Sequence, residues 1–337
     1  MEIYISYFIL SILITFFLLK YYLEFAKKNR YIDNQNPHYN NKPTPTGSGI
    51  IFIFIFLFGN LIFFNFIPEF KDLLPNRFYI FISSLIILVI ICFKDDIKPI
   101  DPILRLIVQI FLIYLSITAL DLKETMLPIK VTFLLAVLVW IYIMNITNFI
   151  DGSDGFLSLN MFFYWSLILL ISFFYNIEIF SKYISISVLP IILVFFIYNK
   201  PVAKLYMGDA GSIFFGFLTG YSFLEILING YWNIALSLLI YPILDCSICL
   251  VRKFFKGYMP WVGLYDYYFL IPVLRNKSNH KNLLYVFIIF HILNSIIIYI
   301  QINYDKPQFI IFNFLLTILM IGLLKKVKIE KFFDKIT

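Results

Sequence analysis

Eleven long apolar segments constrain this chain more than any other feature of its sequence. They lie near residues 3–26, 47–68, 78–93, 103–120, 126–144, 159–175, 182–198, 211–228, 231–250, 283–302 and 307–324. A helix needs about 20 apolar residues to cross the hydrocarbon core of a bilayer, so most of these segments are long enough to span one. A water-soluble fold could not cover this chain with polar surface, because 61% of its 337 residues are hydrophobic and only 14% are charged.

We therefore predict an all-α polytopic membrane protein with about eleven transmembrane helices. Only helices and closed barrels satisfy their backbone hydrogen bonds in lipid, and a barrel would show alternating segments of about ten residues. We expect one integral membrane domain over residues 1–337. No internal repeat is evident, which disfavours the inverted-repeat transporters.

The distribution of Lys and Arg predicts the orientation of the helices. The first apolar segment is followed by Lys27, Lys28 and Arg30, which favours an uncleaved helix with its N-terminus outside. The expected cytoplasmic loops are about 27–46, 94–102, 145–158, 199–210 and 251–282, and the C-terminus is also expected to be cytoplasmic. With Arg105 and the C-terminal tail they hold 20 Lys and Arg, whereas the outside segments hold six. The net charge of +7 is thus explained by topology, and no nucleic-acid partner is expected.

Carboxylates gather on the predicted inside face. They are Asp95, Asp96, Asp101, Asp151, Asp154, Asp209, Asp245 and Asp266. An acid at the centre of a bilayer costs about 2.5–3.5 kcal/mol, so several near one membrane face indicate a shared function. A divalent cation is the simplest reason for such a cluster.

The first group contains Asp95 and Asp96, followed by Arg105 and Gln109. Adjacent carboxylates repel each other and are stabilised by a metal or a cation. Arg105 and Gln109 are four residues apart, so they share one face of a helix. The alternative is an ordinary solvated loop.

The second group places Asn145, Asn148, Asp151 and Asp154 at intervals of three residues. On a helix the early members form a polar stripe. Glycines at 152 and 155 then end the helix and let backbone approach a ligand closely. The spacing does not fit an EF-hand, which leaves a polar turn as the alternative.

The third group is the segment 207–212, Met-Gly-Asp-Ala-Gly-Ser, which precedes a long apolar helix. Backbone amides at such a helix start can receive a phosphate. Asp209 would then lie beside that phosphate, where Mg²⁺ commonly joins a carboxylate to pyrophosphate oxygens.

With these three groups the chain resembles the polyprenyl-phosphate N-acetylhexosamine-1-phosphate transferase family (glycosyltransferase family 4). That superfamily includes the lipid I synthase of peptidoglycan and the enzymes that start O-antigen and related glycans. The resemblance rests on the Asp-Asp pair with its Arg and Gln at 95–109, N-x-x-N-x-x-D-G-x-D-G at 145–155 and M-G-D-x-G-S at 207–212. The segments 43–49 and 242–245 also look like family segments, so the resemblance covers about residues 1–275.

The resemblance implies a phosphoglycosyl transferase of the bacterial inner (cytoplasmic) membrane, with its active site on the cytoplasmic face. Such an enzyme moves an amino-sugar-1-phosphate from a UDP-sugar to undecaprenyl phosphate, releases UMP and initiates a cell-surface glycan. The implied cofactor is Mg²⁺, with Mn²⁺ as the alternative ion. Membrane lipid and a homodimer are the other implied partners, and Gly216 with Gly220 would permit close helix contact.

The resemblance also implies a role for each site residue. Asp209 is the expected metal ligand, and Asp95, Asp96 and Asp154 are the expected catalytic residues. Asp95 and Asp96 would hold the lipid phosphate site, one of them as a base. The expected substrate-binding residues are Asn145, Asn148, Asp151, Asn199, Tyr206, Arg105 and Lys253.

Two loops depart from the family pattern. The His-rich motif of the last inside loop, roughly H-R-[S/D]-H-x-Y-Q in the O-antigen branch, aligns with residues 264–270, which contain no His. In the first loop an R-S-x-H pattern aligns with residues 37–40, where His38 is the only His. His280 and His291 lie beyond the motif and are not expected to be catalytic. The missing His-rich loop favours the glycan-initiating branch over lipid I synthase.

Two other functions stay open on the sequence. One is an inactive relative that binds lipid phosphate or nucleotide sugar, which turnover would exclude. The other is a transporter of lipid-linked sugars, which would need charges deep within its spans. Glu225 is the main charge of that kind.

Overall fold

The computed structural model describes residues 2–33, 43–74, 77–120, 122, 128–175, 177, 179–259, 267–276 and 280–326. The first half contains α1 (Glu2–Lys28), β1 (Ile32–Asp33), β2 (Thr44–Pro45), α2 (Gly49–Phe66), α3 (Pro68–Asp72), α4 (Phe78–Ile97), α5 (Pro102–Ser116), η1 (Ile117–Ala119) and α6 (Ile129–Phe149). The second half contains α7 (Phe156–Phe174), α8 (Ser181–Asn199), α9 (Gly208–Ile228), α10 (Trp232–Phe255), α11 (Ile271–Asn276), α12 (His280–Asn303), η2 (Pro307–Phe309) and α13 (Ile310–Lys326). The two strands pair antiparallel, with Ile32 opposite Pro45.

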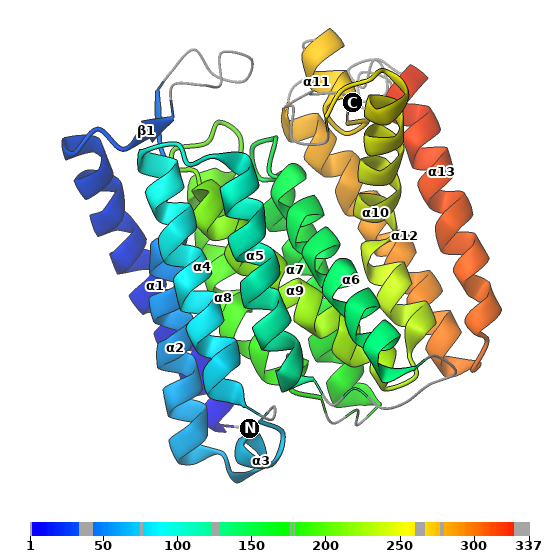
Figure 1. Ribbon diagram of the computed structural model, residues 1–337, viewed down its shortest axis with the longest axis horizontal. Coiled ribbons are helices and arrows are strands. Elements are labelled where there is room, and N and C mark those ends of the chain that lie inside the picture. The colour runs from blue at the N-terminus through cyan, green and yellow to red at the C-terminus, as the bar shows by residue number, and fades with distance from the viewer. Residues whose placement is uncertain are drawn as a thin grey trace.

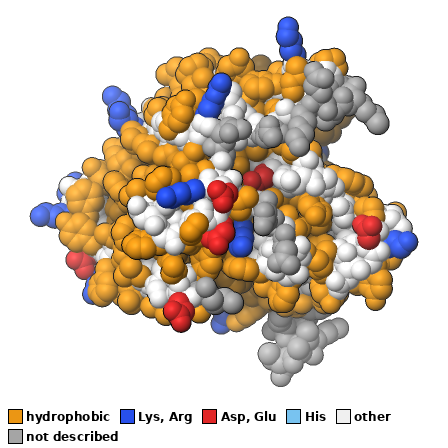
Figure 2. Space-filling view, turned by 90° about the horizontal axis from the view of Figure 1, so that it is seen from below, with side chains coloured by type: hydrophobic (Ala, Val, Ile, Leu, Met, Phe, Trp, Pro, Cys, Tyr) orange, Lys and Arg blue, Asp and Glu red, His pale blue; other side chains and the backbone are white. Residues whose placement is uncertain are grey.

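Within the described residues, eleven helical segments are long and apolar enough to cross a membrane. This confirms the predicted all-α polytopic membrane protein. The long helices run side by side, with β1 and α11 at one end of the bundle and α3 at the other (Figure 1). We call the end with β1 and α11 the site end. The end that carries α3, seen from below, presents a largely hydrophobic surface interrupted by a few charged side chains (Figure 2).

Several helices extend further than their apolar segments predict. Helix α4 continues through Asp95 and Asp96, α6 continues through Asn148, and α10 continues to Phe255. The loops predicted at 94–102, 145–158 and 251–282 therefore begin inside helices. Apolar side chains mark only the hydrocarbon depth of a membrane, whereas backbone hydrogen bonding carries a helix on into the polar interface.

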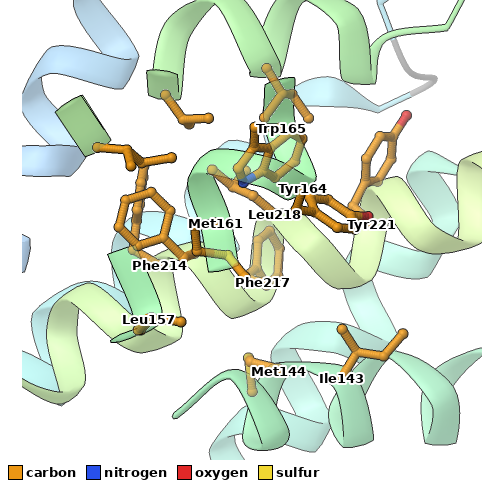
Figure 3. Close-up of a cluster of buried hydrophobic side chains, with 14 of the residues drawn as sticks. Ile143, Met144, Leu157, Met161, Tyr164, Trp165, Phe214, Phe217, Leu218 and Tyr221 are labelled. Carbon is orange, nitrogen blue, oxygen red and sulfur yellow. The ribbon is translucent and has the colours of Figure 1, made fainter. Parts of the chain in front are cut away.

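Helix α9 is the most buried of the eleven segments and positions the site. Its Gly216 and Gly220 face α6: added Cβ atoms would lie 2.6 Å from Met144 O and 2.2 Å from Trp140 Cδ1. The Trp140 Nε1–H also donates to Phe217 O at 2.9 Å. Figure 3 shows buried hydrophobic side chains of α6, α7 and α9, among them Met144, Met161 and Phe217. The glycine pair thus packs α9 against α6 within one chain, as expected of a small-xxx-small pair.

The helices after α9 are joined by buried polar side chains. Asn233 Nδ2 donates to Gln301 Oε1 at 2.9 Å, and Asn313 Nδ2 donates to Asn294 Oδ1 at 2.7 Å. Such amide pairs satisfy each other where lipid offers no partner, and they hold α10, α12 and α13 together.

Candidate active site

The last turn of α4 meets the first turn of α9 at the site end. Asp96 Oδ1 accepts a hydrogen bond from Asp209 N at 2.8 Å, and its Oδ2 accepts one from Ala210 N at 3.2 Å. The first amides of a helix have no partner within the helix and carry partial positive charge. Asp96 therefore caps α9 from a different helix. This corrects our expectation for the third group, since a carboxylate occupies two of the amides that we assigned to a phosphate.

Arg105 joins the other two carboxylates of this cluster. Its Nη1 donates both to Asp95 Oδ2 and to Asp209 Oδ2. Asp95 Oδ1 also accepts from Ile100 N at 2.6 Å. About a quarter of the Arg105 side chain and 30% of the Asp209 side chain are exposed, so both can meet a ligand. We call Asp95, Asp96, Arg105 and Asp209 the acidic cluster.

The start of α5 explains how Arg105 reaches these acids. Asp101 Oδ1 accepts from Ile103 N at 2.9 Å and from Leu104 N at 3.1 Å, and Pro102 occupies the first turn. An Asp cap followed by proline is a strong helix start. The chain therefore reverses directly after α4, and Arg105 lies one turn into α5. The sequence placed a cation near the two acids but did not show that it pairs with Asp209.

The polar stripe of α6 borders the acidic cluster. Asn148 Oδ1 accepts from Ser212 Oγ at 3.2 Å, and the Asn148 side chain lies close to the Asp209 carboxylate. Asn145 Nδ2 donates to Gln109 Oε1 on α5 at a long 3.4 Å. As their spacing predicts, the two asparagines share one face of α6, and this face is directed toward α5 and α9.

Asp151 follows α6, and its carboxyl is influenced by the charges of the acidic cluster. Burial raises the pKa of its carboxyl well above the ordinary value, and the charges of Asp209, Asp96 and Asp154 raise it further. A cation near Asp151 would favour the charged form of its carboxyl.

The turn at residues 150–155 is tied to the loop at 200–207. Asp154 is almost fully buried, and its carboxylate accepts from Ala203 N at 3.0 Å and from Tyr206 Oη at 3.5 Å. Asn199 Oδ1 accepts from Gly155 N at 3.0 Å, and its Nδ2 donates to Leu205 O at 3.2 Å. The structure thus brings Asp154, Asn199 and Tyr206 together, with Asp154 engaged inside the protein.

The segment 43–49 is hydrogen-bonded to this loop. Tyr206 N donates to Pro45 O at 2.8 Å, and Ser48 Oγ donates to Tyr206 O at 3.0 Å. Gly49 starts α2 so close to α9 that an added Cβ would lie 2.0 Å from Gly211 N. Only glycine permits this approach.

Lys253 lies in a different place from the acidic cluster. It is buried near the end of α10, and its Nζ is 5.8 Å from the centre of the Tyr267 ring. Tyr267, Phe269 and Leu270, which occupy part of the aligned His-rich position, are buried as well. Residues 264–266, including Asp266, and residues 37–40, including His38, lie outside the described residues.

The oxygen donors of this site suit Mg²⁺. Among the described residues, no three Asp, Glu, His or Cys side chains form a group that could hold a metal ion by themselves. Protein sites for Mg²⁺ often use one or two carboxylates and complete the shell with substrate phosphates and water. The partly exposed Asp209 carboxylate beside the Asn148 amide fits that pattern.

Comparison with known proteins gives one family. Residues 78–227 match the model of glycosyl transferase family 4, a range that runs from α4 into α9 and contains the whole acidic cluster. Through this segment the chain is similar to glycosyl transferase family 4, the family that the resemblance predicted. The match does not distinguish between the branches of the family.

Several similar relatives carry one name, phospho-N-acetylmuramoyl-pentapeptide-transferase. The protein of Streptococcus thermophilus is 30% identical over 135 residues, which cover 39% of this chain and 38% of the relative. The protein of Streptococcus mutans is 28% identical over 131 residues, with the same coverage, and that of Enterococcus hirae is 34% identical over 112 residues, or 33% of each chain. The chain therefore spans less than two fifths of the length of the curated relatives it matches.

Proposed function

We propose that this chain is a membrane phosphoglycosyl transferase. It transfers an N-acetylhexosamine-1-phosphate, or a related amino-sugar-1-phosphate, from a UDP-sugar to undecaprenyl phosphate. The products are an undecaprenyl-diphospho-sugar, which initiates a cell-surface glycan such as an O-antigen, and UMP. The observation that carries this proposal is the pairing of Arg105 with Asp95 and Asp209, with Asp96 capping the helix that carries Asp209, inside the segment that matches the family.

The reaction is a displacement at phosphorus. An oxygen of the lipid phosphate attacks the β-phosphorus of the UDP-sugar, and the bond from that phosphorus to the bridging oxygen breaks. The bridging oxygen leaves with UMP. Both reactants are anions, so positive charge and exact positioning account for most of the rate acceleration. Arg105, partly exposed between two carboxylates, supplies positive charge from the protein itself.

We assign Asp95 and Asp96 to the phosphate-transfer centre. The attacking phosphate oxygen is already anionic, so the reaction does not need a strong base. Asp95 holds Arg105, and Asp96 holds the first amides of α9, which carries Asp209. We assign both carboxylates to positioning these groups.

Mg²⁺, or Mn²⁺ in its place, would be held by Asp209 with Asn148 beside it. When bound, the ion supplies charge neutralisation at the pyrophosphate. One exposed carboxylate would suffice on the protein side, because substrate phosphates and water commonly complete the shell of Mg²⁺.

The donor binds beside the acidic cluster, at the turn 150–155 and the loop 200–207. Asp151 contributes a polar group, whereas Asp154 and Asn199 fix the turn to the loop. The half-buried Tyr206 ring supplies a surface on which uracil can stack. Lys253 lies at the same end of the bundle and adds to its positive charge. The orientation predicted from Lys and Arg puts this end on the cytoplasmic face of a bacterial inner membrane.

Mass spectrometry of the lipid product tests this proposal. The purified full chain is incubated with Mg²⁺, undecaprenyl phosphate and each member of a panel of UDP-N-acetylhexosamines. A lipid whose mass has grown by one sugar phosphate confirms the transfer and identifies the donor. Unmodified lipid with every donor, from folded protein, contradicts the proposal and favours the inactive binder.

A further inference from the structure

Helix α12 begins against the turn that we assign to the donor. A hydrogen bond of 2.8 Å joins Ser153 Oγ to Nδ1 of His280, the first residue of α12. Ser153 is buried and His280 is half-buried. The two residues are 127 positions apart, and His280 lies outside the segment that matches the family.

Apolar contacts bring the same C-terminal region onto this turn. An added Cβ at Gly155 would lie 3.0 Å from Leu284 Cδ1, one helical turn after His280. The rings of Phe156 and Phe269 stack with their centroids 4.3 Å apart and their planes parallel within 1°. The region after α10 therefore covers one side of the 150–155 turn.

A buried carboxylate fixes residues 268 and 269, which belong to the region that covers the turn. Asp245, on α10, is fully buried, and it accepts from Tyr268 N at 2.8 Å and from Phe269 N at 3.2 Å. The Tyr241 hydroxyl donates to the same carboxylate at 2.8 Å. Phe269 is thus fixed where it meets Phe156, and His280 adds a polar contact to the same turn.

We infer that His280 is a positioning residue for the nucleotide-sugar site. Through Ser153 it fixes the turn that carries Asp151 and Asp154, so that these residues meet the donor in one arrangement. The inference rests on the proposed function, because it assigns the donor to that turn. It gives the C-terminal helices a part in donor binding and leaves acceptor binding to the acidic cluster.

Two substitutions of His280 separate positioning from simple packing. The amide of Asn can take the place of imidazole Nδ1, so His280→Asn keeps a partner for Ser153. The amide of Gln corresponds to Nε2, so His280→Gln loses that partner, as does His280→Ala. Lys281→Ala is the matched control, because Lys281 is the next residue and is exposed.

The experiment is steady-state UMP release by the detergent-purified full chain, with the KM for UDP-sugar and the KM for undecaprenyl phosphate measured separately. We expect His280→Ala and His280→Gln to raise the donor KM about five- to tenfold, the effect of one lost hydrogen bond, with the acceptor KM unchanged. His280→Asn and Lys281→Ala should stay near the wild type. The Ser153→Ala, His280→Ala double variant should be no worse than either single variant, because both remove the same bond.

Three results would overturn the inference. They are an unchanged donor KM in His280→Ala, a parallel change in both KM values, and a failure of His280→Asn to restore the donor KM. If the wild type releases no UMP, the proposed function itself fails. The dissociation constant for UDP-sugar then replaces KM, and equal constants for the wild type and His280→Ala would overturn the positioning role.

Discussion

Gly208 leaves room for the Asp96 carboxylate: a Cβ added at Gly208 would lie 2.3 Å from Asp96 Oδ2. No such atom can stand there without displacing the carboxylate that caps α9. Gly208 also has a φ of +71°, in the left-handed region that favours glycine. The start of α9, and with it the position of Asp209, therefore depends on this residue.

Gly208→Ala is expected to reduce turnover by more than about tenfold, because a displaced Asp96 releases the first turn of α9. Gly230→Ala is the matched control. Gly230 has a φ of +90°, and no described atom lies within 4 Å of its added Cβ. Both variants carry a backbone strain of about 1–2 kcal/mol, but only the first disturbs the cluster. Equal turnover in the two variants would show that the contact with Asp96 is unimportant.

Arg105→Gln should make stability depend on metal. Without the guanidinium, Asp95 and Asp209 lose their cation, which should cost about 1–3 kcal/mol when EDTA is present. Mg²⁺ should restore part of that loss, so it should raise the melting temperature of the variant more than that of the wild type. Thermal unfolding with EDTA and with Mg²⁺ measures this difference. Lys98→Gln, at an exposed site just after α4, is the control. An equal rise of the melting temperature with Mg²⁺ in all three proteins would show that Mg²⁺ does not act at the acidic cluster.

Hydrogen-bond donors around Glu225 explain how its carboxylate is accommodated within an apolar segment. Its carboxylate accepts from Phe180 N and Ser181 N, both at 2.8 Å, and from Tyr221 Oη at 3.3 Å. It therefore caps the start of α8, as Asp96 caps α9. Glu225 lies in the last turn of α9 and not at mid-span as we expected, so the transporter hypothesis loses its main supporting charge.

Glu225→Gln should lower stability by about 1–3 kcal/mol, since an amide NH₂ would face backbone N–H donors. Because Glu225 lies at the end of α9 opposite Asp209, kcat and both KM values should stay unchanged in protein that remains folded. Thermal unfolding and UMP release on the same preparation give both readings. Normal stability with lost activity would instead indicate a functional charge.

The helices were predictable from the sequence because lipid imposes a simple rule on it. Each observed span contains the core of one predicted apolar segment. The spacing of Asn145 and Asn148 also predicted their shared face, since both lie on one helix. Asp101 with Pro102 is a local signal of the same kind, which marks the start of α5.

The contacts that build the site were not predictable in this way. Asp96 and Ala210 are 114 positions apart, and nothing local to either residue indicates the other. Their meeting depends on how α4 packs against α9. At 207–212 the sequence showed a glycine before a helix whose first backbone amides had no evident partner, so we expected a phosphate to bind them. A carboxylate from another helix meets the same need for negative charge. Likewise, the position of His280 beside Ser153 depends on the packing of α12.

A comparison of UMP release by the wild type and by Asp209→Asn tests whether the transfer depends on metal held by Asp209. Each protein is assayed with UDP-sugar in three mixtures: the complete mixture, one without Mg²⁺ and one without undecaprenyl phosphate. We predict release by the wild type that requires both metal and lipid, and no release by Asp209→Asn, although this variant reaches the same yield in the membrane. Substantial turnover by Asp209→Asn, or release that does not need Mg²⁺, would contradict a metal-dependent transfer centred on Asp209.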